Sequence, residues 1–165
     1  MIGNDVVDIV KSRIESDWKR PGFIEKIFTT DEQLLIKESP DQERCVWLLW
    51  SMKEAAYKIY NRQTKIRGFI PKKLHCTIDA YVGTAYTGKV AYSQIIYYTS
   101  TQITTSYIHT IAVSRHSDFA NVIEIENIGV IKDSFGIPHL QTTEGKLKDV
   151  SISHHGQFEK VITLV

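Results

Sequence analysis

Two carboxylates and one lysine are the residues of this chain whose types and spacing could do chemistry. Glu54 and Lys58 lie four residues apart in the stretch 50–58, WSMKEAAYK, and Asp5 follows Gly3 at the end of an apolar run. If Asp5 and Glu54 converge, they would bind Mg²⁺, which prefers few protein carboxylates together with waters and substrate phosphates. Lys58, one helical turn from Glu54, would then suit a phosphate oxygen.

Each of these residues also has a structural interpretation, which the sequence leaves open. A Glu–Lys pair at i,i+4 stabilises a helix by about 0.2–0.5 kcal/mol without any catalytic role. An aspartate near a glycine is also typical of a turn or a helix cap. In the segment 151–156, SISHHG, Ser153 and His154 could aim a hydroxyl and an imidazole at a phosphate. Alternatively, one histidine of this segment is buried and hydrogen-bonded and the other is exposed.

A long helix is expected to position Glu54 and Lys58. One apolar stripe recurs at spacings of three and four, formed by Leu49, Met52, Ala56 and Ile59. The stripe predicts a helix from a cap at Asp41 to about Asn61, with Glu54 and Lys58 on the opposite side. A shorter helix is predicted from Thr30 to about residue 39, because acidic residues follow a threonine there. Residues 2–10 are predicted to form a strand that opens into a loop or helix.

After Pro71 the apolar residues alternate, which is typical of half-buried strands. Strands are predicted at 74–82, 89–99, 106–114, 121–126, 150–153 and 158–165. Turns are predicted between them, at Thr87-Gly88, Ser117-Asp118, Phe135-Gly136 and His155-Gly156. Helices early in the chain and strands later indicate an α+β fold, an antiparallel sheet with a long central helix.

Composition restricts the class of protein. A chain of 165 residues fits one domain, residues 1–165. Twenty basic and nineteen acidic side chains nearly cancel, so net charge predicts neither a nucleic-acid nor a membrane partner. No apolar run reaches membrane-spanning length, and the N-terminus does not have the pattern of a signal peptide. Cys45 and Cys76 are expected to be reduced, buried thiols of a cytoplasmic protein.

Three motifs, in this order, resemble the 4′-phosphopantetheinyl transferase superfamily. They are Gly3-Asn4-Asp5, then Trp50-Ser51-Met52-Lys53-Glu54 with Lys58, then Ser151-Ile152-Ser153-His154. Phe28-Thr29-Thr30 with Glu32 resembles the short segment between the first two motifs. Gly136-Ile137-Pro138 resembles the family's Gly-[Lys/Arg]-Pro turn, with Ile137 in place of the basic residue. The motif order is that of the single-domain holo-(acyl carrier protein) synthases.

The resemblance implies a 4′-phosphopantetheinyl transferase-like fold and a specific reaction. Such enzymes move the phosphopantetheine arm of coenzyme A to a serine of an apo acyl or peptidyl carrier protein, releasing 3′,5′-ADP. Asp5 and Glu54 would hold Mg²⁺, Lys58 would contact the phosphates, and Glu54 or a bound water would take the serine proton. Ser153 and His154 would contact coenzyme A phosphates, reaching the site from a neighbouring subunit. A basic loop would cover the nucleotide, formed by Lys65, Arg67 and Gly68.

The resemblance also implies partners. Carrier proteins are acidic, so a basic first helix would dock them, with Lys11, Arg13, Lys19 and Arg20; the structural alternative is a solvated basic face. A homotrimer is expected first and a dimer second. Val7 stands where some relatives have a third acidic ligand, the role of Asp8 is open, and residues 72–130 are longer than in the compact synthases.

Two competing functions are weighed against the transferase. One is a catalytically silent relative that only binds carrier protein or coenzyme A; the intact acidic and basic motif residues argue against it. The other is a nucleic-acid-binding module, which the balanced charge and the lack of an aromatic-basic motif disfavour. The pathway of the carrier protein (fatty acid, polyketide or peptide biosynthesis) and the acceptance of acyl-coenzyme A are left open.

Overall fold

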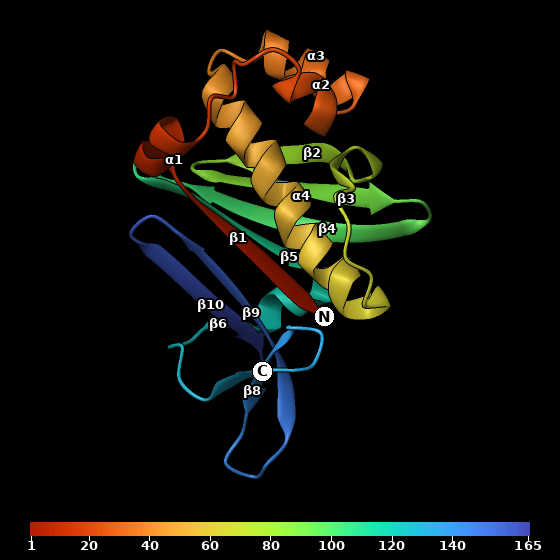
Figure 1. Ribbon diagram of the computed structural model, residues 1–165, viewed down its shortest axis with the longest axis vertical. Helices are drawn as coiled ribbons and strands as arrows, with labels where there is room; N and C mark the ends of the chain where they lie inside the picture. The colour runs from red at the N-terminus through yellow and green to blue at the C-terminus, as the bar shows by residue number, and fades with distance from the viewer.

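The structure, a computed structural model that describes residues 1–165, has four α-helices and two antiparallel sheets (Figure 1). The helices are α1 (Ile9–Glu15), α2 (Phe23–Ile27), α3 (Thr30–Glu38) and α4 (Gln42–Thr64), with short 3₁₀ helices η1 (Pro71–Lys73) and η2 (His116–Asn121). None of the helices combines the length and the apolar character that crossing a membrane requires.

The two sheets have five strands each. The first runs in the order β1-β5-β4-β3-β2, with β1 (Ile2–Asp8), β2 (His75–Val82), β3 (Ala85–Tyr92), β4 (Ile95–Ile103) and β5 (Tyr107–Val113). The second runs β6-β10-β9-β8-β7, with β6 (Val122–Glu124), β7 (Val130–Lys132), β8 (Pro138–Gln141), β9 (Leu147–His155) and β10 (Phe158–Leu164). Because β1 is an edge strand, its free side faces β9 and β10 of the second sheet. The predicted α+β class is therefore confirmed.

The long helix α4 crosses one face of the first sheet (Figure 1). It begins at the predicted cap, where Asp41 accepts a hydrogen bond of 3.0 Å from the backbone N–H of Arg44, and it continues one turn beyond the predicted end. All four residues of the predicted apolar stripe are buried, Leu49, Met52, Ala56 and Ile59. Each large apolar side chain in this layer adds roughly 1.5–3 kcal/mol to stability.

The helix predicted at Thr30 is confirmed, and its cap is Thr29. The Thr29 hydroxyl accepts from the N–H of Glu32, and the Glu32 carboxylate accepts from the N–H of Thr29, which forms a capping box. This helix, with α2, lies over the N-terminal end of α4 (Figure 1).

Some strand predictions were wrong. The single strand predicted at 89–99 is a hairpin of β3 and β4 that turns at Ser93, which has a positive φ of 55°. Thr87-Gly88 is not a turn but lies inside β3. A side chain at Gly88 would overlap the carbonyl of Thr77, so glycine is needed there for close strand packing. The short strands β7 and β8 were not predicted, because three or four residues carry too little periodicity.

Candidate functional site

Asp5 is held against α4 by a close approach of two backbones. The odd-numbered residues of β1 face α4, and a side chain at Gly3 would overlap the carbonyl oxygen of Ala55. Glycine therefore lets the strand cross the helix where Ala55 lies, immediately after Glu54. The same geometry places Asp5, two residues along the strand, beside the polar stripe of the helix.

That polar stripe of α4 does not face solvent. Ser51 is fully buried and its hydroxyl donates to Thr110 at 2.8 Å, while Glu54 and Lys58 are half-buried. The Lys58 ammonium donates to the carbonyl of Asn4 at 2.6 Å and to that of Ile152 at 3.1 Å. It also lies 3.9 Å from Asp5 Oδ1. Lys58 therefore joins β1 of the first sheet to β9 of the second.

Burial and mutual repulsion shape the electrostatics of this site. Burial, and next the negative charge of Asp5, raise the pKa of Glu54 to about 7. Burial also raises the pKa of Asp5, with Lys58 opposing the shift. The pKa of Lys58 is lowered because burial outweighs its attraction to the two carboxylates. Two carboxylates in a poorly solvated place would be stabilised by an added cation.

The donor set fits Mg²⁺ bound together with a phosphate. Asp5 and Glu54 supply carboxylate oxygens, and the contacts of Asp5 with Ser153 and Lys58 are both made through Oδ1. No group of three or more His, Cys, Asp or Glu side chains is placed to enclose a metal ion. Two carboxylates suit an ion that keeps waters and takes its other ligands from a substrate diphosphate.

Strand β9 brings the serine-histidine motif to Asp5 within one chain. The Ser153 hydroxyl accepts from the N–H of Val6 at 2.8 Å and donates to Asp5 Oδ1 at 3.2 Å. The His154 side chain lies on the other side of β9, is exposed and makes no hydrogen bond, while its backbone pairs with Glu159 of β10. The expectation that Ser153 reaches the site from a neighbouring subunit is thereby corrected, because the second sheet supplies it.

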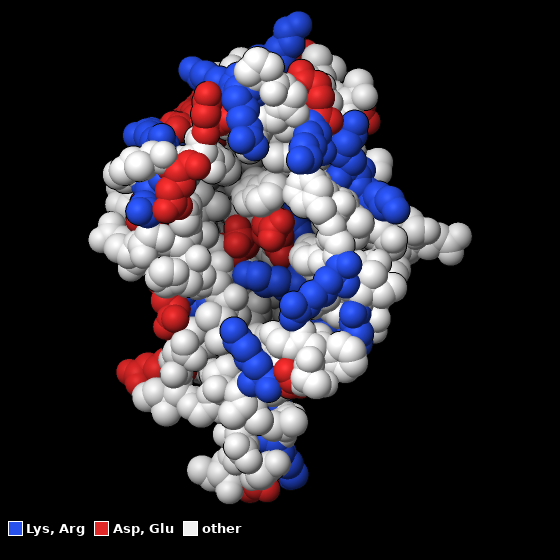
Figure 2. Space-filling view, in the orientation of Figure 1, with Lys and Arg blue, Asp and Glu red and all other residues white.

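Two clefts meet at this cluster. The first cleft, about 790 Å³, contains Asp5 and is lined by aromatic side chains and by two exposed basic ones: Phe23, Trp47, Trp50, Phe69, Arg20 and Lys26. The second cleft, about 330 Å³, contains Lys58 and is lined by Tyr57, Arg62, Lys132, Gly136, Ile137 and Ile152 among others. His154 lines both. Figure 2 shows acidic groups in a hollow at the centre of this face, with basic groups beside them.

A comparison with protein families identifies the fold. Residues 1–112 match the model of the 4′-phosphopantetheinyl transferase superfamily. The chain belongs to this superfamily. The match covers the helices and nearly all of the first sheet of this transferase, and it leaves the second sheet, with Ser153 and His154, outside. A search of curated proteins found no match.

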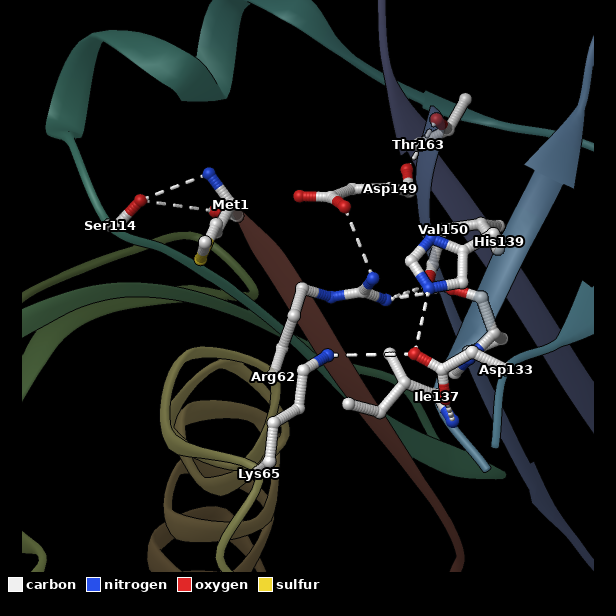
Figure 3. A network of polar contacts seen from close by, with 11 residues as sticks. Met1, Arg62, Lys65, Ser114, Asp133, Ile137, His139, Asp149, Val150 and Thr163 are labelled. Atoms are coloured by element: carbon white, nitrogen blue, oxygen red, sulfur yellow. Dashed lines mark hydrogen bonds and ion pairs between the residues drawn. The ribbon is translucent and has the colours of Figure 1, made fainter. Parts of the chain in front are cut away.

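The predicted nucleotide loop of the transferase contacts the turn between β7 and β8 and helix α4. Lys65 lies 3.5 Å from Asp133, Arg67 donates to the carbonyl of Phe135, and the N–H of Gly68 donates to Tyr57 Oη at 2.9 Å. Figure 3 shows the Asp133 carboxylate between Lys65 and His139. These contacts place the loop beside Gly136 of the second cleft, and its role toward a nucleotide stays a prediction.

The anchor of the second sheet on α4 is Arg62, which sequence reasoning did not assign. Its guanidinium donates to Asp149 at 3.1 Å, to the carbonyl of Pro138 at 2.9 Å and to that of Val150 at 2.7 Å (Figure 3).

The backbone N–H of Ile137, and also the contacts of His139 and Lys65, lower the pKa of Asp133 to about 2. The chain therefore fixes the Gly136 turn through charge as well as backbone geometry.

Of the basic residues predicted to dock a partner, two are paired with acidic side chains and two are not. Lys11 pairs with Glu15 at 3.2 Å, and Arg13 pairs with Glu43 at 2.7 Å. Lys19 and Arg20 make no ion pair with an acid, and Arg20 lines the first cleft. The unneutralised basic charge therefore lies on the loop between α1 and α2, at the first cleft.

Lys53, a residue of the second motif, and Asp8, whose role the sequence left open, hold the fold together. Lys53 is buried and pairs with the buried carboxylate of Glu32 at 2.8 Å, and its ammonium donates to the carbonyls of Pro71 and Leu74. Asp8 caps α1 by accepting from the N–H of Lys11 at 3.0 Å. Neither side chain lines the first or the second cleft.

Lys132 is the candidate that sequence reasoning missed. It lies at the end of β7, lines the second cleft with His154, and makes neither an ion pair nor a side-chain hydrogen bond. The isoleucine in the Gly-Ile-Pro turn was a usable signal, because a missing basic residue invites a search for a replacement nearby. Ile137 itself is buried at 4% exposure and cannot contact a phosphate.

Proposed function

We propose that this transferase moves 4′-phosphopantetheine from coenzyme A to a serine of an apo acyl or peptidyl carrier protein and releases 3′,5′-ADP. The observation that carries the proposal is the approach of Asp5 and Lys58, one in each of the two clefts, with the half-buried carboxylate of Glu54 close enough to interact with both charges. Two carboxylates and an ammonium at one point suit a diphosphate bound with a divalent cation.

The two clefts suit the two ends of coenzyme A. The second cleft is smaller and basic, with Lys58, Arg62 and Lys132, and fits the charged nucleotide. The first is larger and aromatic, and fits the pantetheine arm and the incoming serine loop. The diphosphate would then lie beside Lys58 and Asp5, where the two clefts meet. His154, which lines both clefts, would be able to contact the diphosphate or the nucleotide.

Glu54 is proposed as the general base. The serine oxygen forms a bond to the phosphorus that carries the pantetheine arm, and the bond from that phosphorus to the bridging oxygen breaks. The serine proton passes to the Glu54 carboxylate, and the electron pair of the broken bond stays on 3′,5′-ADP. The pKa of about 7 is that of Glu54 with no cation beside it, and a bound Mg²⁺ would lower it.

Mg²⁺ would be held by Asp5 and Glu54, and when bound it supplies charge neutralisation of the diphosphate. Lys58 adds a fixed positive charge beside Asp5. Its two bonds to backbone carbonyls restrain the ammonium, so it need not reorganise when the leaving group gains charge.

An acidic carrier protein is proposed to approach over the loop between α1 and α2. Arg20 and Lys26 line the first cleft and Lys19 precedes them, so positive charge surrounds the entry for the serine. Charge of this kind mainly accelerates encounter. Cytoplasmic location, a single domain, a homotrimer or dimer, and the pathway of the carrier protein stay predictions.

The test is incubation of the folded protein with coenzyme A, Mg²⁺ and a panel of apo carrier proteins, with release of 3′,5′-ADP followed by chromatography. The nucleotide should appear only when an apo carrier protein is present. A folded protein that binds coenzyme A by calorimetry but releases no nucleotide with any carrier protein would favour the silent-relative alternative.

A further inference from the structure

Strand β9 docks on β1 through side chains instead of a backbone ladder. Three backbone N–H groups of β1 donate hydrogen bonds to alternate side chains of β9. The N–H of Asn4 donates to Ser151 Oγ at 2.9 Å, that of Val6 to Ser153 Oγ at 2.8 Å, and that of Asp8 to His155 Nδ1 at 3.0 Å. Each pair is separated by 147 residues, so the two strands keep one parallel register over all three contacts.

This register follows from the pleat of the edge strand. Successive residues of a strand direct their backbone groups to opposite sides, so Asn4, Val6 and Asp8 direct theirs away from β5. Residues two apart on β9 face the same way and meet these N–H groups. The alternation sends Ser151, Ser153 and His155 toward β1 and leaves Ile152 and His154 on the other face.

The three contacts differ in what they do beyond docking. The Ser151 hydroxyl donates to Asn4 Oδ1 at 2.7 Å, and His155 Nε2 meets Glu15 at 3.1 Å. Of these three β9 side chains, only Ser153 donates to the Asp5 carboxylate, and its single hydroxyl proton is committed to that bond. A Ser153 hydroxyl in this arrangement has no proton left to donate to a phosphate oxygen.

We infer that Ser153 is a positioning residue for Asp5. The Ser153 hydroxyl accepts from the N–H of Val6 in β1 and donates to Oδ1 of Asp5. This bond orients the Asp5 carboxylate so that Oδ2 is available to bind a cation. The inference rests on the proposed function for the identity of that cation, and it replaces the expectation that Ser153 contacts coenzyme A.

The test compares Ser153→Ala with Ser151→Ala. Each variant removes a hydroxyl that docks β9 on β1, but Ser153 contacts the Asp5 carboxylate, whereas Ser151 contacts Asn4. Because Ser151 lines the second cleft, the affinity for coenzyme A is measured for both variants as well. Mn²⁺ binding in the presence of coenzyme A is measured by electron paramagnetic resonance, and Tm is measured in parallel. Both variants should lower Tm to a similar extent. Ser153→Ala should weaken Mn²⁺ binding by about tenfold, whereas Ser151→Ala leaves it nearly unchanged. Ser153→Thr, which keeps the hydroxyl, should restore binding and serves if the alanine variant does not fold.

Equal Mn²⁺ affinity in the two alanine variants would overturn the inference. So would a Ser153→Ala variant with unchanged Mn²⁺ affinity and weaker coenzyme A binding, because the hydroxyl would then contact the phosphate. If Ser153→Ala binds Mn²⁺ more weakly than wild type does, but wild type modifies no carrier protein, the inference stands and the proposed function fails. The two failures are therefore distinguishable.

Discussion

Ser153 Oγ lies 3.2 Å from Asp5 Oδ1, although 148 residues separate the two in the chain. The contact exists because the second sheet folds back along the edge strand of the first. One chain thus contains both the carboxylates and the serine-histidine strand. Any assembly of identical copies would then have one such site for each chain, without exchange of Ser153 between subunits.

Glu54→Gln should change stability in a pH-dependent way. The carboxyl loses its proton at pH 4–5 in the unfolded chain but only at about 7 in the folded one, so it lowers the free energy of unfolding as pH rises through that window. The variant should match wild type at pH 4 and be more stable by on the order of 1–3 kcal/mol at pH 8.

Urea unfolding across this range measures the effect. His109, whose pKa burial lowers to about 4, is present in both proteins, so its titration cancels in the difference between variant and wild type. If the difference in the free energy of unfolding does not vary with pH, the pKa of Glu54 in the folded protein is the same as in the unfolded chain.

Gly3→Ala should displace β1 from α4. A methyl group there overlaps the Ala55 carbonyl, which is backbone and cannot move aside, so we expect a loss of about 1–3 kcal/mol. Gly68→Ala is the control for stability, since a methyl group at that position meets only Ile70, at 3.9 Å, and should change stability by less than about 0.5 kcal/mol. Equal unfolding midpoints for the two variants would refute the close approach.

Lys132→Ala should weaken the use of coenzyme A but not of dephospho-coenzyme A. Lys132 is a free cation in the cleft assigned to the nucleotide, and a lost charged hydrogen bond raises KM by about tenfold. Steady-state transfer with the two donors measures this. Lys148→Ala, an exposed lysine of β9 outside both clefts, is the matched control. Because dephospho-coenzyme A lacks only the 3′-phosphate, an equal rise of KM for both donors would show that Lys132 does not recognise that phosphate.

Lys53→Met should destabilise the protein strongly, and the double variant with Glu32→Gln should recover much of the loss. The single variant leaves the Glu32 carboxylate buried without its cation, which costs about 3–5 kcal/mol. Denaturant unfolding of the two single variants and the double variant measures the coupling. Additive losses would mean that the two charges act independently.

Local patterns were sufficient to predict the helix that carries the site. Asp41, the apolar stripe and the Glu54–Lys58 spacing all act within a few residues, so the sequence predicts α4 and its polar side. Long-range packing decided the rest. The sequence predicts a turn at Gly88, because local sequence does not reveal that the backbone carbonyl of Thr77 packs against this glycine in the folded chain.

The candidate site shows the same division. The motifs indicate Asp5, Glu54 and Lys58, because their residue types suit a diphosphate. The sequence does not reveal that Lys53 turns inward to Glu32, that Ser153 is committed to Asp5, or that Lys132 ends a short strand beside His154. Those facts depend on how the second sheet docks, and this docking joins residues that are far apart in the chain.

The most direct test of the central claim is intact-mass and fragment-mass analysis of an apo carrier protein after incubation with coenzyme A, Mg²⁺ and either wild-type protein or Glu54→Gln. We predict that wild type adds one phosphopantetheine to a single serine and that the variant, folded and present at equal concentration, adds none within the same time. Unmodified carrier proteins across a panel with folded wild-type protein, or equal modification by Glu54→Gln, would contradict the account.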